Sequence, residues 1–196
     1  MEPVAQGEAG PDLVMVPYWL GPAQAAALFD GLLHGLPWQV HRVRMFGREI
    51  DSPRRSCWIG DPDAVYRYSG VRHEPHPWPS LLLPLRERLA GETGVPFNSV
   101  LANLYRDGRD SMGWHSDDEP ELGERPLIAS LSLGATRRFV LRHRRDPSRK
   151  HTLQLPDGSL LLMRGDTQAQ WRHALPRTAR PIGPRINLTF RRIGPA

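Results

Sequence analysis

The chain has 196 residues, a formal net charge of +5 at pH 7 and a single cysteine, Cys57. This length suits one domain with a substantial core of its own. One cysteine excludes an internal disulfide and fits a reducing compartment, and no run approaches the ~20 apolar residues that a membrane-spanning helix needs. We therefore expect a soluble, cytoplasmic protein without a membrane partner, whose positive charge suits a polyanionic one.

The first part of the chain is predicted to hold a tail and two helices. Residues 1–12 are rich in Gly, Pro, Ala and Glu, which predicts a disordered tail, and residues 13–196 are expected to form a single domain. Pro22 suits a first helical turn, so the alanine- and leucine-rich stretch that follows it predicts a helix over 23–36. A second amphipathic helix is predicted over 79–94 and ends at a glycine.

Strand patterns dominate the rest of the chain. Loose alternation predicts a strand over 38–46 and a short one over 66–68, with irregular structure over 47–64. Later strand-like runs, separated by Gly, Pro and Asp turns, cover residues 100–105, 127–133, 138–142, 151–155, 159–163 and 185–191. Many short strands of this kind favour a barrel or sandwich. We predict an α+β fold, in which two N-terminal helices pack on a double-stranded β-helix (jelly-roll) core.

Three potential metal ligands lie in the β-rich half. His115 and Asp117 are two residues apart, and an extended backbone places both side chains on one face. A jelly roll brings distant strands together at one mouth, so His173 can complete the set from another strand. Two imidazoles and one carboxylate leave three metal positions open, as in non-haem Fe(II) oxygenases. Zinc could bind the same three ligands with water as the fourth.

The last predicted strand alternates polar and apolar residues. Arg185, Asn187, Thr189 and Arg191 share one face, and the apolar residues between them share the other. A barrel interior this rich in arginine is costly unless an anion fills it, and a dicarboxylate would do so. Asn103 and Tyr105 offer a second polar pair on a nearby strand, although plain barrel lining explains them equally well.

Taken together, these motifs resemble the AlkB family of Fe(II)- and 2-oxoglutarate-dependent dioxygenases, in particular its branch that repairs alkylated nucleic acid. The resemblance rests on the segments Asn103-Leu104-Tyr105-Arg106-Asp107-Gly108 and Trp114-His115-Ser116-Asp117-Asp118-Glu119-Pro120, on residues 126–134, on His173 and on residues 185–191. It covers about residues 58 to 192, most of the chain.

The resemblance implies a role for each matching residue. The iron ligands, which also form the catalytic centre, would be His115, Asp117 and His173. The residues that bind 2-oxoglutarate would be Arg185 and Arg191, helped by Asn103, Tyr105 and Asn187. The residues near the substrate base would be Glu119, Tyr66 and Trp58, although the loop around Trp58 matches the family pattern poorly.

The family's chemistry implies an oxidative demethylase with Fe(II), 2-oxoglutarate and O2. It would remove N-alkyl groups such as those of 1-methyladenine and 3-methylcytosine from DNA, by hydroxylation and release of formaldehyde. The base must be flipped out or already single-stranded to reach a buried iron, so we expect the enzyme to act on single-stranded alkylated DNA. We also expect it to be a monomer. A predicted hairpin carries a group of cations that could bind the phosphates of DNA or could merely form a solvated tip. These cations are Arg137, Arg138, Arg142, Arg144, Arg145, Arg149 and Lys150.

Other readings of the same residues remain open. The same chemistry could act on methylated RNA, on a protein side chain or on a lipid, and succinate formation stimulated by each class would distinguish them. A zinc hydrolase on this scaffold would need neither oxygen nor 2-oxoglutarate. A non-enzymatic jelly-roll binding module would need neither the triad nor the arginine pair.

Overall fold

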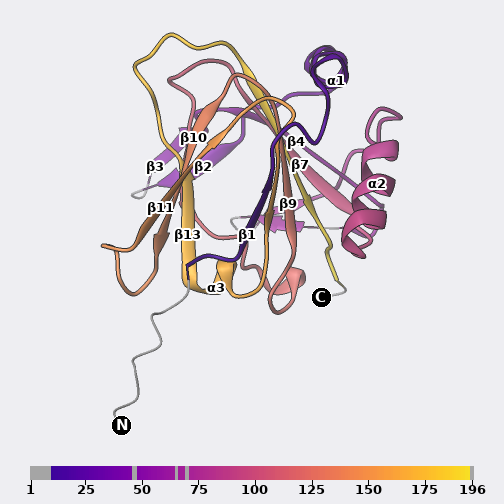
Figure 1. Ribbon diagram of the computed structural model, residues 1–196. Helices are drawn as coiled ribbons and strands as arrows, with labels where there is room; N and C mark the ends of the chain where they lie inside the picture. The colour runs from indigo at the N-terminus through magenta and orange to yellow at the C-terminus, as the bar shows by residue number, and fades with distance from the viewer. Residues whose placement is uncertain (1–9, 46–47, 65, 69–70, 195–196) are drawn as a thin grey trace.

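The computed structural model describes residues 10–45, 48–64, 66–68 and 71–194 (Figure 1). Most of the tail predicted over 1–12 lies outside this described part. The elements are, in chain order, β1 Leu13–Val16, α1 Pro22–Gly35, β2 Arg42–Met45, β3 Arg48–Asp51, β4 Arg55–Gly60, β5 Tyr66–Tyr68, β6 Val71–His73, α2 Leu83–Thr93, β7 Ser99–Tyr105, β8 Met112–His115, the 3-10 turn Pro120–Leu122, β9 Ile128–Gly134, β10 Arg137–His143, β11 Lys150–Leu155, β12 Leu160–Met163, α3 Thr167–Gln170, β13 Trp171–Leu175 and β14 Arg185–Arg191.

Two antiparallel sheets form the core of the fold. The larger sheet has the order β1-β12-β9-β14-β7-β4, and the smaller one has the order β11-β10-β13-β8. Figure 1 shows the smaller sheet on the left and the larger one to its right, with α1 and α2 on the outer side of the larger sheet. Neighbouring strands are mostly distant in sequence, as in a jelly roll. The predicted α+β fold with a double-stranded β-helix core is confirmed.

The two helices cover the outer face of the larger sheet because each carries one apolar stripe. Leu32 of α1 and Leu89 of α2 are fully buried in the same cluster as Ile186, Leu188 and Phe190 of β14. Burial of a leucine or phenylalanine side chain stabilises a fold by roughly 1.5–3 kcal/mol. Since side chains alternate along a strand, packing the apolar face of β14 on the helices turns its polar face towards the smaller sheet.

Both predicted helices are present, but the expectation of irregular structure over 47–64 was wrong. β3 and β4 occupy that segment, and both β4 and β1 belong to the larger sheet. All residues of β4 except Arg55 are buried, so the alternation that marks a half-exposed strand is missing from it. The strand predicted over 38–46 is shorter, and α2 begins at Leu83 rather than at residue 79.

The predicted end of α2 is confirmed. Gly94 adopts φ 73°, in the left-handed region, and its N–H donates to the carbonyl of Ala90 at 2.8 Å. Among the described residues, no helix has both the length and the apolar character needed to cross a membrane.

Candidate metal centre

The three predicted metal ligands meet between the two sheets. His115 is the last residue of β8 and lies directly opposite His173 of β13 in the strand register. Asp117 follows two residues after His115, and one potential ligand atom from each of the three lies within 4.8 Å of the others. Asp117 and His173 are buried, whereas His115 is half-buried. The set therefore has one partly open side, through which a substrate could approach.

The hydrogen bonding of His115 and the pKa shifts of His173 and Asp117 suit a divalent cation. The Nδ1 atom of His115 lies 2.9 Å from the carbonyl of Gly113, so a proton on Nδ1 leaves the lone pair of Nε2 for a metal. Burial, with the charge of His115, lowers the pKa of His173 to about 3, which keeps its imidazole neutral. Burial raises the pKa of Asp117, but Arg191 and the imidazoles outweigh it and lower the pKa to about 2, so the carboxylate is ionised.

Arg191 contacts the proposed ligand carboxylate directly. Its Nη2 donates to Oδ1 of Asp117, and both side chains are buried. The second oxygen of Asp117 lies 3.8 Å from Nε2 of His173. The sequence predicted only a 2-oxoglutarate role for Arg191, whereas the structure shows that it also neutralises and orients the carboxylate.

A second buried arginine lines the same pocket. Arg185 is 1% exposed, and its Nη2 donates to Ser132 Oγ at 2.8 Å and to Asn187 Oδ1 at 2.6 Å. Its Nε and Nη1 have no hydrogen-bond partner among the described residues. Burial lowers the pKa of Arg185 to about 10, against the opposing effect of Tyr105. A buried cation with open donors fits an anionic ligand, and a carboxylate matches the planar fork of a guanidinium.

The other predicted 2-oxoglutarate residues line the same pocket. Asn103, Tyr105 and Asn187 face its interior together with Arg185 and Arg191. Sequence reasoning missed its apolar lining, which is formed by Leu101, Met112, Phe139, Met163 and Leu175. Phe139 lies 5.3 Å from His173, ring centre to ring centre. The alternation of β10 could have indicated this residue, because Phe139 and Leu141 face inward.

Arg54 is a further residue that the sequence did not predict to support the pocket. It lies between β3 and β4, and its Nε donates to Oδ1 of Asn103 at 2.8 Å. Asn103 is 2% exposed and lines the pocket, whereas Arg54 does not line it. Arg54 therefore holds the side chain of Asn103, a residue predicted to bind 2-oxoglutarate. No local pattern marks this arginine, because its partner is distant in the chain.

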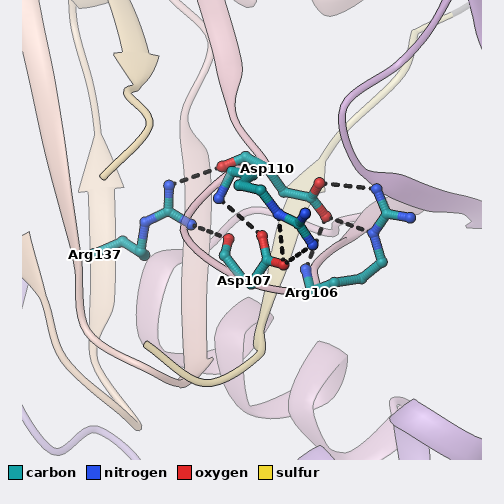
Figure 2. Close-up of polar contacts among 5 residues, drawn as sticks. Arg106, Asp107, Asp110 and Arg137 are labelled. Atoms are coloured by element: carbon teal, nitrogen blue, oxygen red, sulfur yellow. Dashed lines mark hydrogen bonds and ion pairs between the residues drawn. The ribbon is translucent and has the colours of Figure 1, made fainter. Parts of the chain in front are cut away.

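Arg137 was wrongly grouped with the cations of the exposed hairpin. It is 3% exposed, and its terminal nitrogens donate to the carbonyls of Asp107 (3.2 Å), Asp110 (2.8 Å) and Pro176 (2.8 Å). Figure 2 shows it holding the turn after β7, where Arg106 also pairs with Asp110. Arg137 therefore fixes two loops rather than facing solvent.

Of the residues predicted to contact the substrate base, Trp58 and Glu119 are not among the described residues that line the pocket. Trp58 is 7% exposed and packs in the apolar cluster between the sheets, with its indole N–H donating to the carbonyl of Ala64 at 3.2 Å. Stacking of a base on its face would therefore need a rearrangement. Glu119 is half-buried, just before the 3-10 turn. The backbone of Tyr66 belongs to β5, and its side chain lies outside the described part of the structure.

Comparison with known proteins agrees with this geometry. The sequence profile of the 2OG-Fe(II) oxygenase superfamily matches residues 12–191. The chain is 38% identical over 190 residues to alpha-ketoglutarate-dependent dioxygenase alkB homolog 3 of Homo sapiens, covering 92% of this chain and 66% of that protein. It is 40% identical over 183 residues to the DNA oxidative demethylase ALKBH2 of Homo sapiens, covering 88% and 70%. The solved structure of OsALKBH1 superposes with a TM-score of 0.64 at 17% identity, over 94% of this chain and 100% of the other, which supports the fold alone.

The chain therefore belongs to the 2OG-Fe(II) oxygenase superfamily and, within it, to the AlkB family. It spans 63% of the length of the Bos taurus homolog 3 and 66% of the human one, so it is shorter than these relatives. The family uses Fe(II), 2-oxoglutarate and O2. The donors present fit that set, because two imidazoles and a carboxylate suit Fe(II) and a buried guanidinium with open donors suits a carboxylate.

Proposed function

We propose that the protein is an Fe(II)- and 2-oxoglutarate-dependent oxidative demethylase that removes N-alkyl groups from bases of single-stranded DNA. The observation that carries the proposal is the juxtaposition, in one pocket, of His115, Asp117 and His173 with the incompletely paired Arg185. A zinc hydrolase would use the triad but would leave Arg185 without a purpose. The names of the two human relatives, a dioxygenase and a DNA oxidative demethylase, supply the reaction class and the substrate.

Each part of the pocket has its own task in this proposal. His115, Asp117 and His173 would hold Fe(II), which with 2-oxoglutarate and O2 supplies oxidation of an N-methyl C–H bond, followed by loss of formaldehyde. Arg185 would pair with the distal carboxylate of 2-oxoglutarate, and Asn103, Tyr105, Asn187 and Arg191 would complete its binding site. The apolar lining would exclude water from the reacting atoms.

Residues outside the iron pocket would contact the nucleic acid. Glu119 precedes the 3-10 turn that follows Asp117, where it could face the alkylated base. The family resemblance implies the same role for Tyr66, and for Trp58 only if the buried indole rearranges. The base must leave the stack to reach iron between the sheets.

We also propose that the protein acts as a monomer in the cytoplasm. Size-exclusion chromatography would test the oligomeric state, and cell fractionation would test the location.

The outer face of the smaller sheet supports a polyanionic substrate. Arg142 of β10 lies directly opposite Lys150 of β11 on one side and Arg172 of β13 on the other. None of the three has an ion-pair partner within the described ranges, and like charges opposite each other destabilise a sheet. The guanidinium of Arg142 lies 4.5 Å from the ring centre of Trp114, which is 41% exposed. A row of cations beside an exposed aromatic ring suits phosphates and a stacked base.

The decisive experiment measures formaldehyde from an oligonucleotide that contains 1-methyladenine or 3-methylcytosine, with and without Fe(II) and 2-oxoglutarate. Asp117→Ala should abolish turnover while the protein stays folded, because it removes the only charged metal ligand. Asp30→Ala serves as the matched control, since Asp30 is exposed on α1. Formaldehyde from a folded Asp117→Ala protein, or undiminished turnover without 2-oxoglutarate, would contradict the proposal.

The same assay distinguishes the substrate classes. Methylated RNA and methylated peptide, tested beside methylated DNA, should give less succinate than the DNA. Replacement of Arg172 and Lys150 by glutamine should weaken DNA binding for every sequence and reduce the salt slope by about 0.7 log units per lost contact with single strands. Arg192→Gln is the control, because Arg192 is exposed beyond the end of β14. An unchanged salt slope would remove this face from the proposal.

A further inference from the structure

The backbone of Asp117 is held by a side chain from another part of the fold. Asp117 lies beyond the last residue of β8, where the described pairing of β8 with β13 ends at His115 and His173. Its backbone N–H donates to the side-chain Oε1 of Gln168 at 2.9 Å. A buried N–H group that lacks a sheet partner needs another acceptor, and Gln168 provides it.

Gln168 is itself held firmly in place. It is the second residue of the single-turn helix α3, and it is 1% exposed. Its Nε2 lies 3.5 Å from the sulfur of Met163, a residue that lines the metal pocket. Both ends of the amide therefore have partners, so its orientation is defined, with the oxygen facing Asp117.

A second contact joins the same two segments. The hydroxyl of Ser116 donates to the carbonyl of Trp171 at 2.8 Å, and both residues are buried. Gln168 and Trp171 lie on the segment that leads directly to His173. The segment that ends in one imidazole ligand thus fixes the backbone that carries the carboxylate ligand.

We infer that Gln168 is a positioning residue for the metal centre, which sets the place of the Asp117 carboxylate by holding its backbone N–H. This inference rests on the proposed iron site. Metal binding demands ligand positions within a few tenths of an ångström, and loss of an outer partner of a ligand typically weakens metal affinity 10–100-fold. Gln168 is not among the described residues that line the pocket, so it acts through Asp117 and Met163.

The test is a titration of the metal-free protein with Co(II), which reports both affinity and, through its absorption spectrum, coordination geometry. Gln168→Met keeps the side-chain volume but removes the oxygen acceptor, and should raise the Kd for Co(II) about 10-fold or more and alter the spectrum. Gln170→Met is the matched control, because Gln170 lies on the same helix with an exposed side chain and should bind Co(II) as the wild type does. Gln168→Glu retains an oxygen acceptor and should bind Co(II) more tightly than Gln168→Met.

The results that would overturn the inference differ from the result that would overturn the proposed iron site. A folded Gln168→Met protein whose Kd stays within about twofold of the wild type overturns the inference, and so does a Gln168→Glu protein as weak as Gln168→Met. If Gln168→Met does not fold, Gln168→Asn replaces it, because its shorter amide cannot reach Asp117 and its Kd should rise in the same way; an unchanged Kd again overturns the inference. Failure of the wild-type protein to bind Co(II) overturns the proposed iron site instead.

Discussion

Two buried arginines lie close to the Tyr105 ring, and they differ in how their donors are used. The guanidinium carbon of Arg185 is 5.3 Å from the ring centre, and that of Arg137 is 5.7 Å from it. Arg137 donates to three backbone carbonyls, those of Asp107 and Asp110, which Figure 2 shows, and that of Pro176 in another loop. Arg185 donates from Nη2 alone, to two side chains of the barrel, and its Nε and Nη1 have no partner within the described residues.

The difference separates a structural arginine from a binding one. Both side chains are almost fully buried, and burial lowers the pKa of each, so desolvation alone does not distinguish them. They differ in how many hydrogen-bond acceptors the protein offers to each guanidinium group. A buried donor without an acceptor destabilises the fold, and a ligand that accepts its hydrogen bond removes that cost. Four arginine substitutions follow, from the largest expected effect to the smallest.

Arg185→Met should nearly abolish 2-oxoglutarate binding. Loss of a buried, charge-assisted pair costs about 3 kcal/mol or more, which is over 100-fold in Kd. The free energy of unfolding should stay level or rise, because an apolar side chain of similar volume replaces an incompletely paired buried charge. Isothermal titration with 2-oxoglutarate and urea unfolding measure the two quantities. A variant that binds 2-oxoglutarate normally would transfer the carboxylate contact to another residue.

Arg137→Met should show the opposite pattern. It leaves the carbonyls of Asp107, Asp110 and Pro176 without their charged donor, so the free energy of unfolding should fall by about 3 kcal/mol. Urea unfolding of the metal-free protein measures this loss. Equal stability of Arg137→Met and Arg185→Met would remove the distinction between the two arginines.

Arg191→Lys should affect the metal and the co-substrate together. The ammonium keeps the charge but loses the planar fork, and Arg191 contacts Asp117 in the structure. We expect Co(II) and 2-oxoglutarate affinities each to fall by roughly 2 kcal/mol. Paired titrations check this outcome. A fall in 2-oxoglutarate affinity alone would show that the ion pair with Asp117 does not support the metal.

Arg54→Met should have the smallest effect. Its side-chain hydrogen bond to Asn103 is half-buried, so its removal should weaken 2-oxoglutarate binding by about 1 kcal/mol and leave Co(II) binding unchanged. The same two titrations measure both affinities. A loss as large as that of Arg185→Met would make Arg54 a principal contact for the co-substrate rather than a support for Asn103.

The sequence by itself determined the parts of this protein that depend on local spacing. Strand alternation placed Arg185, Asn187 and Arg191 on one face of β14, and the extended spacing of His115 and Asp117 placed both towards one centre. These predictions succeeded because side-chain direction in a strand has a period of two residues. Residue chemistry then limited the occupants to a divalent cation and an anionic ligand.

Only the tertiary structure decided which partners those side chains have. It buried β4, which local patterns had predicted to be irregular, and it buried Arg137, which they had predicted to be exposed. It paired Arg191 with Asp117 and placed Gln168 against the Asp117 backbone. Contacts of this kind join residues far apart in the chain, and burial makes them strong, because the interior offers neither water nor alternative acceptors to a polar group. Sequence spacing carries no record of such contacts.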